Sequence, residues 1–229
     1  MPTINKRFLL RAVLALAAFA AVLVGAHAVQ ARRIPAALKG QADRAADAGK
    51  TDVAVHYLRQ YLEFHPDDVD TQVRLAELLA KRSPTQGGLR ELLFLYDKIL
   101  RLDPSKHDIR REALSTALRL GKFADAVAHG QALLEQFPND APLWLQVGLA
   151  QAGLNQNAAA RKSYEAAVRA APDKIGGYQQ LAQLVWKGLD DAAGARRVLD
   201  DMVRALPQEP DAYLIRARFE TFTADEANP

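Results

Sequence analysis

Apolar residues recur every three or four positions through most of the chain, and five of the runs they form end at a proline. Such spacing places the apolar side chains on one face of a helix. A proline ends a helix because it has no N–H group and clashes with the preceding turn. The runs are YLRQYLEFHP, LYDKILRLDP, GQALLEQFP, YEAAVRAAP and LDDMVRALP. The pattern predicts an all-α protein built from short helices.

These prolines recur at intervals of 38, 34, 34 and 35 residues. A fixed interval of this length is typical of a repeat of helix pairs. Three positions of the helix before each proline share one face: they lie twelve, eight and five residues before the proline. The first of them is mostly a small residue. In chain order these sets are Ala54, Leu92, Ala126, Ala160, Ala195; Leu58, Tyr96, Gly130, Tyr164, Leu199; and Tyr61, Ile99, Leu133, Ala167, Met202.

An earlier helix fits into each repeat, and its strongest signature is Trp144-x2-Val147-Gly148. Together with Ala160, Tyr164 and Pro172, these residues resemble the tetratricopeptide repeat (TPR) family, whose pattern is W-x2-L-G-x2-Y, A-x3-F and P. The chain departs from that pattern at Gln151, where the family has Tyr. The resemblance implies that Trp144 and Tyr164 are packing residues.

The resemblance covers about three quarters of the chain and implies a TPR α-solenoid, a right-handed superhelix of antiparallel helix pairs. Neighbouring pairs share one core because a single pair cannot bury its own apolar face. The second unit carries four extra residues around 81–88, and the fifth carries one near 188–191. The expected segments are 1–33, an anchor or signal; 34–209, five TPR units at 35–68, 69–106, 107–140, 141–174 and 175–209; and 210–229, a lone sixth first helix with a tail.

In the TPR family the first helices line a concave groove that binds extended peptides or helices of other proteins. By this analogy we expect a protein or peptide ligand in a groove with an apolar middle and two arginines at one side. Its side chains are Arg111, Leu118, Arg119, Leu145, Leu149, Gln179 and Trp186. The alternative is that these side chains fill gaps between successive first helices.

Some TPR proteins bind C-terminal carboxylates with a clamp of lysine, asparagine and arginine. Lys39 occupies the position of the clamp lysine, but Asp43 occupies the position where the clamp has asparagine. The sequence therefore argues against that binding mode.

Twenty residues without formal charge, Ala12 to Ala31, separate Arg11 from Arg32. As a helix they would extend about 30 Å, the thickness of a bilayer core, although nine are alanine. We expect residues 12–31 to form a single-pass anchor in a membrane, with the TPR body extracytoplasmic. The alternative is a signal peptide cleaved near Ala28 that releases a secreted or periplasmic protein.

Charge and composition limit the chemistry. The five basic residues of 1–33 account for the overall charge of +3, and the remaining 25 basic and 27 acidic residues give −2. Without a basic stripe, nucleic acid is not an expected partner. Cysteine is absent, the five histidines have no metal-binding spacing, and no phosphate-binding loop or nucleophile motif occurs. We expect no cofactor, no metal and no enzymatic activity.

Two functions follow as hypotheses. The first is a non-catalytic interaction scaffold, of bacterial type, tethered at the membrane. The alternative is an exported envelope assembly factor with a cleaved signal. Residues 210–222 interleave apolar and charged positions and form a poor terminal cap, so self-association through them, or continuation into a longer array, is expected.

Overall fold

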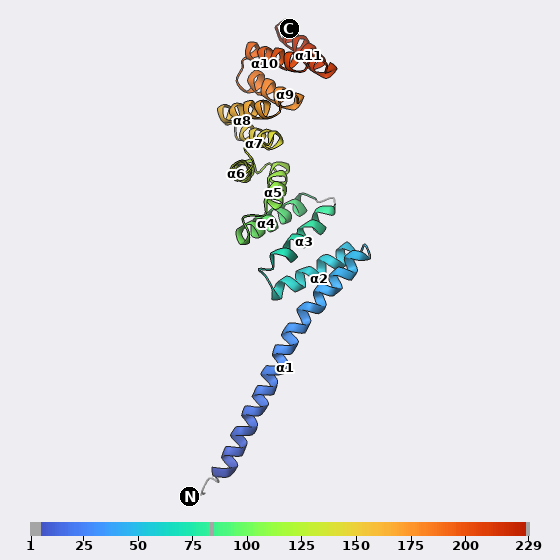
Figure 1. The fold of residues 1–229 in the computed structure, drawn as a ribbon, viewed down its shortest axis with the longest axis vertical. Helices are drawn as coiled ribbons and strands as arrows, with labels where there is room; N and C mark the ends of the chain where they lie inside the picture. The colour runs from blue at the N-terminus through green and yellow to red at the C-terminus, as the bar shows by residue number, and fades with distance from the viewer. Residues whose placement is uncertain (1–5, 83–84, 228–229) are drawn as a thin grey trace. The chain divides into compact units, whose positions relative to one another are not determined.

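The structure is a computed structural model that describes residues 6–82 and 85–227, and every regular element in those ranges is helical (Figure 1). It divides into two compact units, Met1–Arg82 and Ser83–Pro229, here called the N-terminal and C-terminal units. The helices are α1 (Lys6–Asp47), α2 (Thr51–Phe64), α3 (Val69–Lys81), α4 (Gln86–Leu102), α5 (His107–Arg119), α6 (Phe123–Leu134), α7 (Ala141–Gly153), α8 (Asn157–Ala170), α9 (Ile175–Gln183), the π-helical turn η1 (Leu184–Gly188), α10 (Ala192–Ala205) and α11 (Pro210–Ala227).

Helices pack mainly on their neighbours in sequence within each unit. In the N-terminal unit α1 packs on α2 and α2 on α3. In the C-terminal unit the same order continues from α4 to α11, and first helices also touch one another, α5 with α7 and α7 with α9. Such nearest-neighbour packing is the property that makes a helical repeat array almost one-dimensional.

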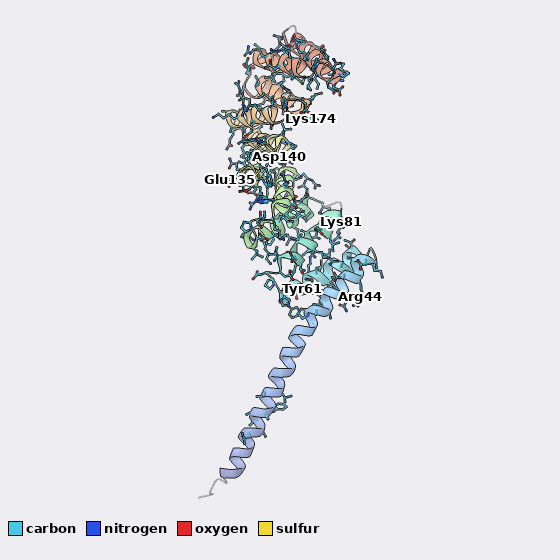
Figure 2. All side chains as sticks on the ribbon, viewed as in Figure 1. Arg44, Tyr61, Lys81, Glu135, Asp140 and Lys174 are labelled. Atoms are coloured by element: carbon cyan, nitrogen blue, oxygen red, sulfur yellow. The ribbon has the colours of Figure 1, made fainter. Side chains whose placement is uncertain are left out.

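The second helices bury the face that the sequence pattern predicts. The small position twelve residues before each proline is buried in all five repeats, as is the position four residues later. The next position is buried in four of them, whereas Tyr61, labelled in Figure 2, is partly exposed. Its hydroxyl donates a 2.7 Å hydrogen bond to Asp68. The predicted buried face of the second helices is therefore confirmed at every position except Tyr61.

A left-handed residue closes the turn between the two helices of four repeats. Gly49, Gly121, Asn155 and Asp190 have φ values of 71°, 68°, 58° and 54°. They occupy the same repeat position, two residues after the end of the first helix. Glycine, asparagine and aspartate adopt this backbone conformation more readily than other residues.

Aspartates are the N-cap residues of several helices. Asp68, Asp140 and Asp191 accept hydrogen bonds from the backbone N–H groups of Thr71, Leu143 and Gly194. Each satisfies an N–H group that has no partner within its helix. Capping thus accounts for the position of these carboxylates at the starts of the helices.

The extra residue of the fifth repeat is absorbed in the π-helical turn η1. The N–H of Leu189 bonds the carbonyl of Leu184 at 3.0 Å, and the N–H of Asp191 bonds that of Val185 at 3.0 Å. A π turn is the usual result of inserting one residue into an α-helix. The insertion thus lies within the end of the first helix, slightly earlier than the sequence predicted.

Trp144 departs from its expected burial. Its side chain is partly exposed, and Nε1 donates a 2.8 Å hydrogen bond to the carbonyl of Pro138. The prediction of a core residue was wrong for Trp144 because its polar nitrogen reaches the solvent-facing turn. Tyr164, the other expected packing residue, is only 2% exposed.

Residues of the expected membrane segment belong to α1, which continues as one 42-residue helix into the first repeat. The described side chains Leu14, Leu16, Phe19 and Val22 are exposed. Across the parts of the chain that the structure describes, no helix combines the length and apolarity needed to cross a bilayer. The side chains of 23–33, including the expected cleavage site, lie outside the described ones.

The helix α11 docks on α10 through an ion-pair network. Arg196 binds both carboxylate oxygens of Glu220 at 2.7 and 3.0 Å, and Arg216 binds Asp200 at 2.7 Å. Phe219 is buried, whereas Leu214 and Phe222 are exposed. Arg216 and Glu220, two of the charged residues that interrupt the apolar pattern of this helix, therefore hold it in place.

Candidate functional site

Two neighbouring cavities open between the first helices of the C-terminal unit. The first lies between α7 and α9, has a volume of about 420 Å³ and is here called the amide cavity. Its lining consists mainly of amide and apolar side chains: Leu149, Ala152, Asn155, Asn157, Tyr164, Gln180, Gln183, Leu184, Lys187 and Gly188.

The second cavity lies between α9 and α11, has a volume of about 320 Å³ and is here called the aromatic cavity. Gln183 lines it as well, so the two cavities adjoin. Its lining is mainly apolar: Gln179, Ala182, Gln183, Trp186, Leu199, Ile215, Arg218, Phe219 and Phe222.

The π-helical turn positions the aromatic wall. Trp186 lies in the middle of η1 and meets Phe219 of α11 edge to face, with ring centroids 5.2 Å apart. The ammonium of Lys187 lies 3.7 Å from the centroid of the Trp186 ring. Edge-to-face contact and a cation over the indole both hold the ring in one orientation.

The lining of the amide cavity includes a buried tyrosine, Tyr164. Tyr164 packs flat on Gly148, where a Cβ atom would lie only 2.5 Å from Tyr164 Cε1. Within the described part of the chain, its hydroxyl forms no hydrogen bond. Burial raises the pKa of Tyr164, so the hydroxyl stays protonated and can donate or accept a hydrogen bond. A polar group in this position is suited to a ligand.

One edge of the amide cavity is held by a hydrogen bond between repeats. Asn157, the first residue of α8, donates from Nδ2 to the carbonyl of Gly188 at 2.6 Å. Leu149 lies on the opposite helix α7 and is 49% exposed. The hydrogen bond from Asn157 therefore fixes one end of the cavity, and Leu149 gives it an accessible apolar side.

Both cavities are electropositive in composition. Lys187 belongs to the lining of the amide cavity and Arg218 to that of the aromatic cavity, whereas neither lining contains Asp or Glu. The nearby carboxylates Glu220 and Asp200 are engaged by Arg196 and Arg216.

The structure separates the predicted groove residues into two groups. Leu149 lines the amide cavity, and Gln179 and Trp186 line the aromatic cavity. Leu145 is half-buried and packs against the core of the last repeats. Leu118 is also half-buried, and Arg119 is exposed at the end of α5; neither lines the two cavities.

Arg111 serves a contact between repeats. It binds Asp140, the N-cap of α7, at 2.8 Å and lies 5.0 Å from the ring centroid of Phe137. In the N-terminal unit Lys39 approaches Asp68, the N-cap of α3, at 3.5 Å. Both pairs are 29 residues apart, so equivalent positions join one repeat to the next.

Asp43 likewise pairs with Arg74 on the following first helix. Lys39 and Asp43, the residues considered for a carboxylate clamp, thus both form ion pairs within the N-terminal unit.

Sequence reasoning missed the amide side chains and Arg218. Asn155 could have been noticed as a left-handed turn residue, but no sequence signal showed that it borders a cavity with Gln180. In the described ranges, no cluster of three His, Cys, Asp or Glu side chains is arranged to hold a metal ion.

Tandem helix pairs with a shared core define a TPR-like all-α fold. The chain belongs to the bacterial transcriptional activator domain (BTAD) family, which matches residues 29–182. Among curated proteins, ER membrane protein complex subunit 2 of Xenopus tropicalis is 24% identical over 164 residues, covering 70% of this chain and 53% of that protein. The chain thus spans about half the length of the curated relatives it matches.

Solved structures show the same fold. MamA (41 to the end) from Desulfovibrio magneticus is 20% identical with a TM-score of 0.59, over 75% of this chain and 94% of its own. YrrB, described as a TPR protein with an unusual peptide-binding site, is 15% identical with a TM-score of 0.61, over 77% and 88%. A TPR protein from Parabacteroides merdae is 17% identical with a TM-score of 0.61, over 85% and 75%.

Proposed function

We propose that this chain is a non-catalytic scaffold that binds a segment of another protein in the adjoining amide and aromatic cavities. The observation that carries the proposal is that Gln183 lines both cavities, so they lie side by side. Together they combine the exposed apolar side chains Leu149 and Phe222 with the amide groups of Asn155, Gln180 and Gln183, which have no side-chain partner in the described part of the chain. A pocket with apolar walls and a few fixed polar groups is the usual form of a binding site.

The proposal is compatible with the name of the family, since a transcriptional activator can use a helical repeat domain to contact protein. Direct contact with nucleic acid is not part of it, because residues 34–229 carry a net charge of −2. The peptide-binding site named for YrrB supports the same kind of ligand by analogy of fold.

Site-specific photocrosslinking tests the proposal. Benzoylphenylalanine placed at Leu149 or Phe222 should crosslink to a partner protein in cells. The matched control is Phe94, which is 67% exposed on α4 and lines neither cavity. Crosslinks from the two cavity positions alone would support the site. Equal crosslinks from Phe94, or none from the cavities, would contradict it.

Membrane attachment is a separate proposal, as is the extracytoplasmic location of the body. It is supported by the uncharged stretch from 12 to 31 and by the exposed Leu14, Leu16 and Phe19. Among the described residues, however, no helix is long and apolar enough to cross a membrane. Carbonate extraction of membranes tests attachment. Mass spectrometry of the mature N-terminus tests the alternative, an exported assembly factor cleaved near Ala28. A full-length chain in the soluble fraction would contradict both.

A further inference from the structure

We propose that the ligand is an extended peptide with a large apolar residue flanked by acidic residues. This inference rests on the proposed function and adds the chemistry of the ligand. The apolar residue occupies the aromatic cavity, the main chain crosses Gln183, and the carboxylates face Lys187 and Arg218.

The aromatic cavity selects the apolar residue. Trp186, Phe219 and Phe222 supply aromatic surface from two separate elements, and Leu199 supplies an aliphatic contact. The Trp186–Phe219 contact exists before any ligand arrives, so these two rings need little reordering on binding. Phe222, which is 59% exposed, can bury its ring against the entering side chain.

The amide cavity matches a peptide main chain. Asn155, Gln180 and Gln183 each carry a donor and an acceptor, and in the described part of the chain none has a side-chain partner. The hydroxyl of Tyr164 adds a fourth group without a partner on a residue that is 2% exposed. An extended main chain has unpaired N–H and C=O groups on both edges, whereas a helix satisfies its own. These groups therefore favour an extended segment over a helix.

The positive charges of Arg218 and Lys187 favour acidic residues on either side of the apolar residue of the peptide. Arg218 is exposed and forms no ion pair within the described ranges, and Lys187 lies over Trp186 at the junction of the cavities. Because no carboxylate lines either cavity, a basic peptide would meet only like charge. Electrostatic complementarity of this kind selects the sign of the partner more than it adds affinity.

Selection from a random peptide library tests the ligand chemistry. The full chain is immobilised, and a phage library of linear peptides is selected on it, with chain-free beads as the control. We expect enrichment of sequences in which a large apolar residue lies within three positions of two or more Asp or Glu. Enriched peptides of neutral or basic character that still crosslink at Leu149 would overturn this inference and leave the proposed function intact. Absence of any enrichment would overturn both.

A charge exchange completes the test. The dominant peptide and its counterpart with every acid changed to Lys are titrated against the full chain, and the acidic form should bind at least tenfold more tightly. On the variant Lys187→Glu with Arg218→Glu, this ratio should fall by tenfold or more. Both side chains are exposed, and unchanged thermal unfolding checks that the variant folds. A ratio near one on the unaltered chain would refute the charge assignment without reference to any variant.

Discussion

The indole of Trp144 is bonded to the turn that precedes its own helix, with Nε1 donating to the carbonyl oxygen of Pro138 at 2.8 Å. In three other places, the side chain six residues after a repeat proline also donates a hydrogen bond to the carbonyl oxygen of that proline. The donors and acceptors are Gln72 and Pro66, Arg110 and Pro104, and Tyr213 and Pro207. The TPR tryptophan position thus joins the start of a first helix to the turn between repeats.

Two substitutions at Trp144 should distinguish the contribution of this hydrogen bond to stability from that of side-chain packing. Trp144→Phe keeps most of the ring contact and should lower the free energy of unfolding by about 1 kcal/mol. Trp144→Ala should cost more, but less than the roughly 3 to 5 kcal/mol of a fully buried aromatic, because the side chain is partly exposed. Urea unfolding of the full chain, followed by circular dichroism, measures both. Equal losses for the two variants would show that the hydrogen bond, not packing, accounts for the whole effect.

The carboxylate of Asp68 should make stability depend on pH in the acid range. Burial opposes its ionisation, but hydrogen bonds from Thr71 and Tyr61 and the charge of Lys39 outweigh it and lower its pKa from 3.8 to about 2. Since the folded pKa is the lower one, the stabilisation is present above about pH 4 and is lost as the pH falls from there toward 2.

Asp68→Asn retains an oxygen for the N-cap and removes the charge, so it should flatten this acid-range loss in thermal unfolding. The adjacent Asp67→Asn, at an exposed position, is the control and should keep the wild-type pH profile. If Asp68→Asn unfolds with the same pH profile as the unaltered chain, the network around Asp68 does not stabilise its charge.

The open face of α11 provides a test of self-association. Tyr213, Leu214 and Phe222 are exposed, whereas Phe219 is buried against Trp186. If residues 210–222 pair two copies, light scattering should show a dimer that Leu214→Asp converts to monomer. Phe219→Asp is unsuitable because it should disrupt the docking of α11 itself. A monomeric chain before the substitution would refute self-association through this face.

Much of the fold was predictable because the prolines and small residues mark positions that depend on local chemistry. Ala160, for example, had to be small to admit a neighbouring helix, and it is completely buried. The cavities were not predictable in the same way. Trp186 reaches the aromatic cavity through a π turn, and Arg111 turns away to Asp140, which begins the next first helix. Both outcomes depend on where a neighbouring element lies, which the spacing within one repeat does not reveal.

Removal of the Tyr164 hydroxyl should weaken peptide binding without lowering the stability of the fold. Since the hydroxyl has no partner in the described part of the chain, Tyr164→Phe should leave the free energy of unfolding within about 0.5 kcal/mol of the unaltered chain. Affinity for a selected peptide should fall about fivefold, as expected for one lost neutral hydrogen bond of about 1 kcal/mol. Titration calorimetry and urea unfolding measure the two quantities. A stability loss of several kcal/mol would show that the hydroxyl has a structural role.

The central claim is tested most directly by measuring how tightly one selected peptide binds two variants of the chain. One variant has a polar substitution inside the cavities, and the other has a polar substitution outside them. Leu149→Asn changes an exposed apolar residue of the amide cavity, and Phe94→Asn makes a comparable change on α4. We expect the first to weaken binding about tenfold, equivalent to about 1.4 kcal/mol, and the second to leave it unchanged. Equal affinities for the unaltered chain and Leu149→Asn, or an equal loss for Phe94→Asn, would contradict a binding site in these cavities.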